Sequence, residues 1–310
     1  MFVQGHFMPN RREFVWSCAG SFAAGAALAW GKPRARSERI RIGSQTNTFG
    51  VPIKPWDRLL EVLDTLAKLD YASFETSVGS LTPYRDRPAE CRKAFESRHV
   101  PLLAAHTSGQ LWDRTKQADE VGGLAVIAGW SAQMGATHMI MSAPPFPQGN
   151  RAPDTELAHT KAEGLNRVGE ACRKEGLKFC YHNHTAEFEG APSQMDIILK
   201  ETDPKVVWLN YDVGNAYPHG PNPAVFSAEH FRRIAIYHLK DAVAGPDGKA
   251  QFTDLGAGKI DLKGVVAPVL DSDWQGWLVI EREGKWPNPV ADPEGELRQC
   301  RQYLRQITGI

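Results

Sequence analysis

An eightfold alternation between short strand-like runs and longer helix-like stretches constrains the fold of this chain more than any other feature of its sequence. The short runs are rich in β-branched and aromatic residues, and the longer stretches repeat apolar residues at helical spacing. Eight such pairs predict an α/β fold, a single (β/α)8 TIM barrel. The predicted strands are 40–46, 72–75, 100–106, 138–142, 178–182, 206–211, 234–239 and 277–281. The predicted helices are 56–69, 88–98, 117–134, 155–174, 192–200, 223–230, 262–270 and 293–307.

An open, doubly wound sheet is the competing arrangement for alternating strands and helices. Such a sheet usually carries a glycine-rich phosphate loop after its first strand. Residues 41–50 read RIGSQTNTFG and contain no G-x-G-x-x-G pattern. The sequence therefore favours the closed barrel.

Composition narrows the class of protein. The chain has 310 residues, of which 42% are hydrophobic and 23% charged, so it can bury a core of barrel size. Lysine plus arginine equals aspartate plus glutamate, at 36 each, so the overall balance builds no positive field for a phosphate backbone. We expect no nucleic-acid partner. The five cysteines show no C-x-x-C spacing, which argues against a zinc knuckle or a disulfide framework.

The first thirty residues differ from the rest of the chain. Arg11 and Arg12 stand just ahead of the weakly apolar stretch 14–30, and Ala27 and Ala29 offer an A-x-A cleavage site. This order resembles a twin-arginine export signal. We expect a periplasmic or otherwise exported protein without stable membrane insertion after cleavage; an uncleaved N-terminal anchor is the alternative. The expected organisation is a twin-arginine-type signal peptide at 1–29, a linker at 30–39 and the barrel at 40–310.

Four potential metal ligands lie at the ends of the last four predicted strands, namely His182, Asp212, His238 and Glu281. The carboxyl ends of barrel strands surround the active site, so these side chains are expected to converge. Each alone has an ordinary explanation, such as a hydrogen-bonded loop histidine or a turn-capping aspartate. Two nitrogen and two oxygen ligands suit one divalent ion and leave positions for substrate. Mn²⁺ is the preferred candidate, ahead of Co²⁺, Fe²⁺, Zn²⁺ and Mg²⁺.

Two further residues share the inward face of these strand ends. His184 alternates with His182, so it is predicted to be a proton-handling neighbour of the metal. Lys240 follows His238 by two residues, where a cation could hold a substrate oxygen or stabilise developing negative charge. A salt bridge from Lys240 to Asp241 or to another acid at the rim is the alternative.

Other polar residues are predicted to line the pocket. Glu75 and His106 end the second and third strands; Glu75 is a candidate catalytic group, and Glu283 is expected to be a solvated rim residue. The candidate substrate-binding residues are His106, Gln45, Asn183, Glu187 and Asn215.

Five sequence motifs occur in a familiar order: YHNH, YDVGN, HLKD, LGAGKID and VIERE. With them, residues 40–310 resemble the xylose-isomerase-like barrel superfamily of sugar isomerases and epimerases. The resemblance implies that a divalent ion is bound by a glutamate, an aspartate, a histidine and a second glutamate. These positions map onto the four ligands named above, but His182 stands where many members carry the first glutamate.

The resemblance also implies the chemistry. A small-molecule carbohydrate with an α-hydroxycarbonyl group would lose a carbon-bound proton to give an enediolate stabilised by the ion. In related epimerases the paired glutamates shuttle this proton. Because only Glu281 is retained here, the second acid or base must be His184, Glu187, His106 or Glu75. Isomerisation, epimerisation and elimination from a 3-oxo-glycoside share these first steps and remain open, the last as a lyase or hydrolase alternative.

Two other functions compete with a sugar isomerase or epimerase. Apurinic endonucleases of this superfamily need three metal ions, but Met141 and Ser142 end the fourth strand without a histidine, and Asn215 stands where a second histidine would be expected. A non-catalytic periplasmic sugar-binding barrel would keep the pocket and lose the chemistry. The sequence leaves the oligomeric state open, a homo-oligomer included.

Overall fold

The computed structural model describes residues 35–147, 155–217, 220–245, 249–283 and 288–310. The predicted signal peptide lies outside these residues. In the described part of the chain, no helix is both long enough and apolar enough to cross a membrane.

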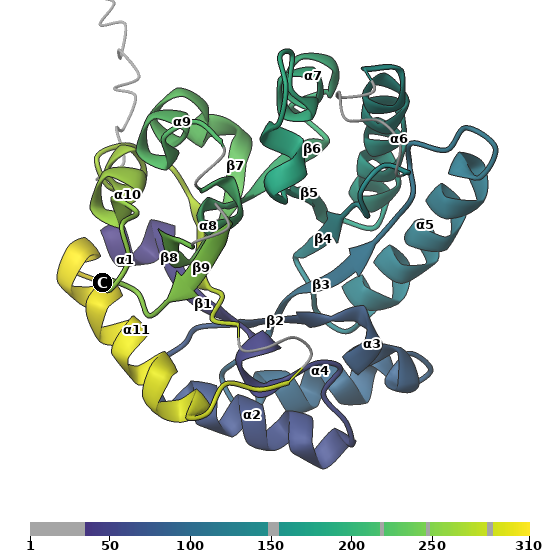
Figure 1. The fold of residues 1–310 in the computed structure, drawn as a ribbon. Helices are drawn as coiled ribbons and strands as arrows, with labels where there is room; N and C mark the ends of the chain where they lie inside the picture. The colour runs from purple at the N-terminus through teal and green to yellow at the C-terminus, as the bar shows by residue number, and fades with distance from the viewer. Residues whose placement is uncertain (1–34, 148–154, 218–219, 246–248, 284–287) are drawn as a thin grey trace, which may run out of the picture. The chain divides into compact units, whose positions relative to one another are not determined.

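Eight parallel strands close into a barrel in the order β1-β10-β7-β6-β5-β4-β3-β2, and helices surround them (Figure 1). This arrangement confirms the predicted single (β/α)8 barrel. The barrel strands are β1 (Ile40–Gln45), β2 (Phe74–Ser77), β3 (Leu102–Ser108), β4 (His138–Ser142), β5 (Lys178–His182), β6 (Val207–Asp212), β7 (Ile234–Leu239) and β10 (Gly276–Ile280). The main helices are α2 (Trp56–Lys68), α4 (Pro88–Glu96), α5 (Gln117–Gln133), α6 (Thr155–Lys174), α7 (Gln194–Glu201), α9 (Pro223–His230), α10 (Leu262–Leu270) and α11 (Pro293–Thr308).

The helices form where apolar spacing and capping residues agree. In α2 the buried residues Leu59, Val62, Leu63 and Leu66 recur at helical spacing and face the sheet. Ser193 caps α7 by accepting a hydrogen bond from the backbone N–H of Asp196, at 3.1 Å. These local signals explain why most predicted elements fall within a few residues of the observed ones.

Residues 36–39, predicted as linker, form the single helical turn α1 (Arg36–Arg39). Arg39 donates to the carbonyl of Trp274 at 2.8 Å, and Arg36 donates to the carbonyl of Thr308 at 3.3 Å. These two polar side chains therefore hold the turn against the barrel, and the predicted linker contains a helical turn at its end.

An apolar layer of side chains, which we call the floor, fills the barrel interior directly beneath the predicted site and includes Cys180, Ile236 and Val279. Cys180, Ile236 and Val279 are fully buried in one interior cluster, and each precedes a predicted ligand by two positions. Since side chains alternate between the two faces of a strand, the ligand that follows lies on the same inward face, one layer nearer the carboxyl end. The floor therefore fixes the depth at which the polar groups lie.

A two-stranded antiparallel hairpin that the sequence prediction missed follows β7, formed by β8 (Asp241–Ala244) and β9 (Ala250–Thr253). Its base is held by Asp241, whose carboxylate accepts backbone N–H groups of Ala242, Gly256, Gly258 and Ile260. The only available sequence signal was the short alternating runs on either side of GPDG.

Candidate metal centre

The four predicted ligands converge at the carboxyl ends of β5, β6, β7 and β10. One ligand atom from each of His182, Asp212, His238 and Glu281 lies within 4.8 Å of the others, and all four residues are buried. We call this set the ligand cluster. Strand register explains the convergence, since Asp212 is directly paired with His238 across β6 and β7. Four residues spread over 100 positions of sequence thus meet at one point.

Three members of the ligand cluster carry a buried polar atom without a hydrogen-bond partner. These atoms are Nδ1 of His182, Nδ1 of His238 and Oε2 of Glu281. An unpartnered buried nitrogen or oxygen is costly, so native proteins rarely keep several together unless another species satisfies them. The nitrogen of His238 lies 2.6 Å from that oxygen of Glu281, in a geometry that does not meet the criteria for a hydrogen bond. The cluster therefore fits a divalent cation.

The environment of His238 leaves its Nδ1 available as a ligand. Its Nε2 contacts Oε2 of Glu75 at 2.7 Å, and the side-chain amide of Asn210 lies 2.9 Å away, with an oxygen that has no other partner and could also accept a proton from Nε2. A carboxylate behind a histidine favours the tautomer with the proton on Nε2, which leaves the Nδ1 lone pair free. Burial opposes a charged imidazole here, but the carboxylates of Glu75 and Glu281 outweigh it and raise the pKa of His238 to about 10. The carboxylates around His238 thus favour a positive charge at this point of the site.

Charge balance supports the same conclusion. Glu75, Asp212 and Glu281 are buried carboxylates, and Lys240 is the buried ammonium beside them. With the His238 imidazolium that its raised pKa indicates, the group has one net negative charge. A divalent ion that displaced this proton would meet two net negative charges and neutralise them. Burial lowers the pKa of His182 well below its usual value, which favours the neutral ring that metal binding requires.

Lys240 lies inside the cluster rather than at its edge. Its ammonium is 2.9 Å from Oδ2 of Asp212, 3.1 Å from Oε2 of Glu281 and 3.4 Å from Glu283. Burial opposes its charge, but these carboxylates outweigh burial and raise the pKa of Lys240 well above its usual value. The alternative of a salt bridge to an acid other than Asp241 is therefore confirmed, whereas Asp241 caps backbone N–H groups instead. Glu283 is half-buried, with 26% of its side chain exposed at the cavity, and burial is the first cause that raises its pKa, to about 7.

Asp212 is held in place by its own loop. Its two carboxylate oxygens accept hydrogen bonds from the backbone and side-chain nitrogens of Asn215, at 2.8 and 2.9 Å. Asn183 makes a reciprocal pair with the backbone of Asp212, both bonds measuring 3.0 Å. Asn215 still lines the cavity, whereas Asn183 does not. Asn183 thus supports the backbone of Asp212, and its predicted contact with substrate stays a prediction.

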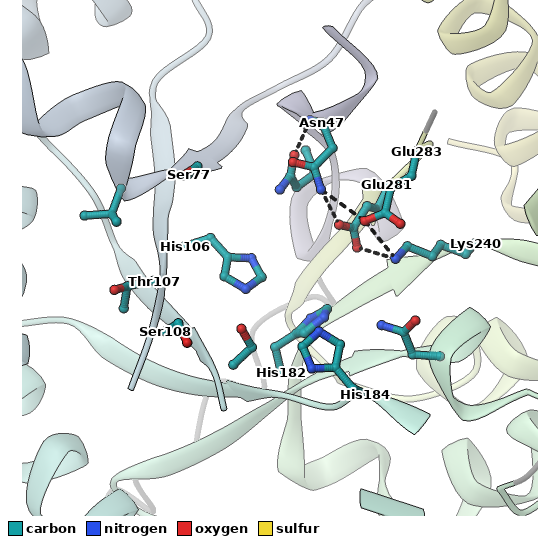
Figure 2. Close-up of a pocket in the computed structure, with 14 residues that line it drawn as sticks. Asn47, Ser77, His106, Thr107, Ser108, His182, His184, Lys240, Glu281 and Glu283 are labelled. Atoms are coloured by element: carbon teal, nitrogen blue, oxygen red, sulfur yellow. Dashed lines mark hydrogen bonds and ion pairs between the residues drawn. The ribbon is translucent and has the colours of Figure 1, made fainter. Parts of the chain in front are cut away.

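A cavity of about 460 Å³ opens above the ligand cluster. Figure 2 shows its two sides: Lys240, Glu281 and Glu283 lie on one, while Ser77, Thr107 and Ser108 lie on the other. Of the predicted residues, those that line it are Gln45, His106, His182, His184, Asn215, Lys240 and Glu281. Gln45 uses its side-chain oxygen to accept the backbone N–H of Asn47, whose amide donates to Glu281 at 2.8 Å.

Two imidazoles flank His182 within this cavity. The ring of His106 is 4.9 Å from the His182 ring, and the ring of His184 is 5.1 Å from it, centroid to centroid. Nδ1 of His106 contacts Oε1 of Glu75 at 2.8 Å. Glu75 thus bridges His106 and His238 while lying outside the cavity lining.

Glu187, a candidate for substrate contact or proton transfer, does not line the cavity. Its carboxylate is buried against Lys161 and Tyr181. The structure thus places Glu187 in the layer behind the cavity, and its predicted contact with substrate stays a prediction.

Sequence reasoning missed Asn210 as a partner of His238, and it missed the row of hydroxyl groups formed by Ser77, Thr107, Ser108 and Ser142. A signal for Asn210 existed, because a polar residue interrupts the apolar β6 run two positions before Asp212. Register shifts occur just before Asn210 and just before Glu75, so both partners of His238 follow a local irregularity. Such irregularities often re-aim side chains beside functional sites.

Fold and site together define a class of protein, a (β/α)8 barrel whose strand ends gather two imidazoles and two carboxylates suited to a metal ion. A model of the xylose isomerase-like TIM barrel family matches residues 63–307, and the chain belongs to this family. The family resemblance read from the sequence motifs is thereby confirmed.

The relatives found by sequence are sugar-modifying enzymes. The chain is 25% identical over 278 residues to inosose dehydratase of Geobacillus kaustophilus, covering 80% of this chain and 86% of that protein. For most of the similar inosose dehydratases the match spans about half of their length, as with 54% of the protein from Geobacillus thermodenitrificans.

Similar folds occur among solved structures. The IolI protein with a bound zinc atom superposes with a TM-score of 0.71 at 15% identity, over 87% of this chain and 98% of IolI. An L-ribulose 3-epimerase gives a TM-score of 0.70 at 14% identity, over 87% of this chain and 95% of the epimerase. At these identities the likeness concerns the fold alone.

Proposed function

We propose that this protein is a divalent-metal-dependent sugar isomerase or epimerase. It removes the proton next to the carbonyl of an α-hydroxycarbonyl carbohydrate, giving an enediolate. The observation that carries this proposal is the ligand cluster, with its three buried atoms that lack a hydrogen bond and its negative charge. His182, Asp212, His238 and Glu281 would hold the ion, and Mn²⁺ remains the preferred candidate. When bound, the ion would act as a Lewis acid that polarises the carbonyl and stabilises the enediolate.

The proton is transferred by His106 in this proposal. Its Nδ1 is held by Glu75, so its Nε2 is the nitrogen left to take a proton from substrate. Glu75 orients His106 and also supports His238, which ties the position of the base to that of the ligand cluster. His184, on the other side of His182, delivers the proton. Two imidazoles thus replace the glutamate pair of related epimerases.

The cavity favours an uncharged carbohydrate. Among the described residues that line it, Lys240 is the one lysine or arginine, and three carboxylates already surround its ammonium. Ser77, Thr107, Ser108 and Ser142 offer hydroxyl groups, which suit the hydroxyls of a sugar. A phosphate group would find no free cation in this part of the chain.

Elimination is the second candidate, with loss of water or of the glycosidic alcohol of a 3-oxo-glycoside. The inosose dehydratases among the relatives favour it. Proton removal by His106 would be the shared first step, and His184 would then protonate the departing oxygen instead of a carbon. A sugar receptor without catalysis would need neither imidazole.

The test is solvent isotope exchange. Purified protein loaded with Mn²⁺ is incubated in deuterated water with ketoses, cyclic polyol ketones and 3-oxo-glycosides, and products are followed by NMR and mass spectrometry. Deuterium on the carbon next to the carbonyl is expected, and it should be lost in His106→Gln. His159→Gln is the matched control, since His159 contacts Glu201 at 2.8 Å on the surface. Sugar binding without exchange would refute catalysis, and Mn²⁺-dependent cleavage of abasic DNA would favour a nuclease.

We also propose export of the protein through its N-terminal segment. The support is the pair Arg11-Arg12 ahead of a weakly apolar stretch. Fusing residues 1–34 to a reporter should send it to the periplasm, and changing both arginines to lysine should retain it in the cytoplasm.

A further inference from the structure

A lysine is fully buried in the helix layer behind the metal centre. Lys161 lies on α6 with 1% of its surface exposed, although lysine is almost never buried without partners. Its ammonium donates to the hydroxyl of Tyr181 at 3.0 Å, to Oε1 of Glu187 at 3.2 Å and to Oε1 of Gln194 at 2.6 Å. All three of its protons have acceptors, and these come from β5, the following loop and α7.

Glu187 extends this network toward the cavity. Its Oε1 also accepts the hydroxyl of Tyr181 at 2.6 Å, and its Oε2 accepts the backbone N–H of His184 at 2.9 Å. The backbone N–H of Glu187 donates back to the carbonyl of His184 at 3.3 Å. One carboxylate therefore joins the buried ammonium to the residue that presents an imidazole to the cavity.

The same loop is fixed at a second point. The hydroxyl of Thr185 donates to the carbonyl of Asn215 at 2.9 Å, and Asn215 holds Asp212. The η3 turn (Thr185–Phe188) is thus attached both to the helix layer and to the ligand cluster.

A contribution to folding stability does not by itself explain the buried ion pair between Lys161 and Glu187. Well-packed apolar residues often replace a buried ion pair without loss of stability, because desolvation offsets much of the attraction. The ion pair instead fixes the orientation of the Glu187 carboxylate, because each of its oxygens has its own donors. The backbone N–H of His184, which donates to one of these oxygens, is thereby held in one position.

We propose that Lys161 and Glu187 are positioning residues that hold His184 in place for proton transfer. Neither side chain lines the cavity, so both act through His184. This inference rests on the proposed function for the role of His184, but the ordering of the loop can be tested without it.

The first experiment measures turnover of the full, metal-loaded protein by isotope exchange. We expect Lys161→Met to lower kcat by about 10- to 100-fold, as a small misplacement of a catalytic group does, with KM and Mn²⁺ affinity nearly unchanged. Lys174→Met is the control, since Lys174 is an exposed lysine on the same helix. In a His184→Ala background, Lys161→Met should change kcat less than about threefold, because residues that act through one another are not additive. An equal loss in both backgrounds would overturn the proposal.

A second variant separates positioning from stability. Lys161→Met/Glu187→Leu removes both buried charges, so it should unfold at a higher temperature than Lys161→Met. Its kcat should stay low, since the N–H of His184 has lost its acceptor. Recovery of kcat together with thermal stability would show that the ion pair only supports the fold.

Amide hydrogen exchange tests the loop independently of activity. Peptides covering residues 183–189 should exchange faster in Lys161→Met than in wild type or Lys174→Met, while peptides from β4 stay unchanged. Unchanged exchange at 183–189 would refute the inference. If the wild type turns over no carbohydrate, the proposed function fails, whereas the exchange result still decides whether Lys161 orders the loop.

Discussion

Gly214 should be irreplaceable because Lys240 packs directly against it. Gly214 lies in the short helix α8 (Val213–Ala216), two residues after Asp212, the second ligand of the cluster. A Cβ atom added there would lie 2.5 Å from Cβ of Lys240, 3.0 Å from Cε1 of Phe252 and 3.1 Å from Cδ of Lys240. The first of these atoms is fixed to the backbone, so rotation of the lysine side chain cannot relieve the clash.

We therefore expect Gly214→Ala to be destabilising and to disturb the site. Overpacking of this kind costs about 1–3 kcal/mol. For a domain of this size, roughly 2–4 °C of Tm is lost per kcal/mol, which gives a drop of about 2–12 °C. The displacement passes to the Lys240 ammonium, so Mn²⁺ affinity should also change.

Thermal denaturation followed by circular dichroism, together with Mn²⁺ titration, would measure both effects. Gly123→Ala in α5 is the control, because no atom lies within 4 Å of the added Cβ. There the gain in helix propensity should stabilise the protein by about 0.4–1 kcal/mol. The reasoning is refuted if Gly214→Ala melts as high as Gly123→Ala and binds Mn²⁺ like the wild type.

Three further outcomes are expected. Glu281→Gln should abolish stoichiometric Mn²⁺ binding measured by calorimetry, and retained binding would remove Glu281 from the ligand cluster. Asn183→Ala should lower the free energy of unfolding in urea by about 1–3 kcal/mol, because it leaves the buried N–H of Asp212 unpaired. KM should stay unchanged, and a raised KM would show that Asn183 contacts substrate. His138 is buried, which lowers its pKa to about 3, so the folded protein keeps it neutral while the unfolded chain binds a proton below about pH 6.5. This group should therefore lower the free energy of unfolding by up to about 1.4 kcal/mol for each pH unit between 6.5 and 3. The loss should be smaller in His138→Gln. Urea titrations that give the same pH dependence for both proteins would contradict this prediction.

The comparison of sequence and structure is clearest at the strand ends. The position of His182, Asp212, His238 and Glu281 at the ends of apolar runs predicted their convergence, and one ligand atom from each lies within 4.8 Å of the others. Period-two alternation predicted that His184 shares the inward face of His182, and both line the cavity. Alternation is local, so a sequence can reveal it wherever an apolar run precedes the polar residue.

The partners of these residues could not be predicted in the same way. Glu187 follows His184 by three residues, yet it faces Lys161 of the preceding helix and only its second oxygen reaches back to His184. Asn183 lies between two cavity histidines and pairs with the backbone of the neighbouring strand. In both cases the deciding contact comes from another element, whose distance in the chain gives no signal.

The sequence by itself determined the order of the eight barrel strands and of their main helices, the closed barrel and the four side chains at its carboxyl end, because these follow from patterns along single segments. Tertiary structure alone decided which of the remaining polar groups face the cavity. It paired Glu75 with both His106 and His238, placed Lys240 among three carboxylates, and turned Glu187 toward Lys161. Hydrogen bonds and charges act through space, and only the closed fold brings their partners within reach.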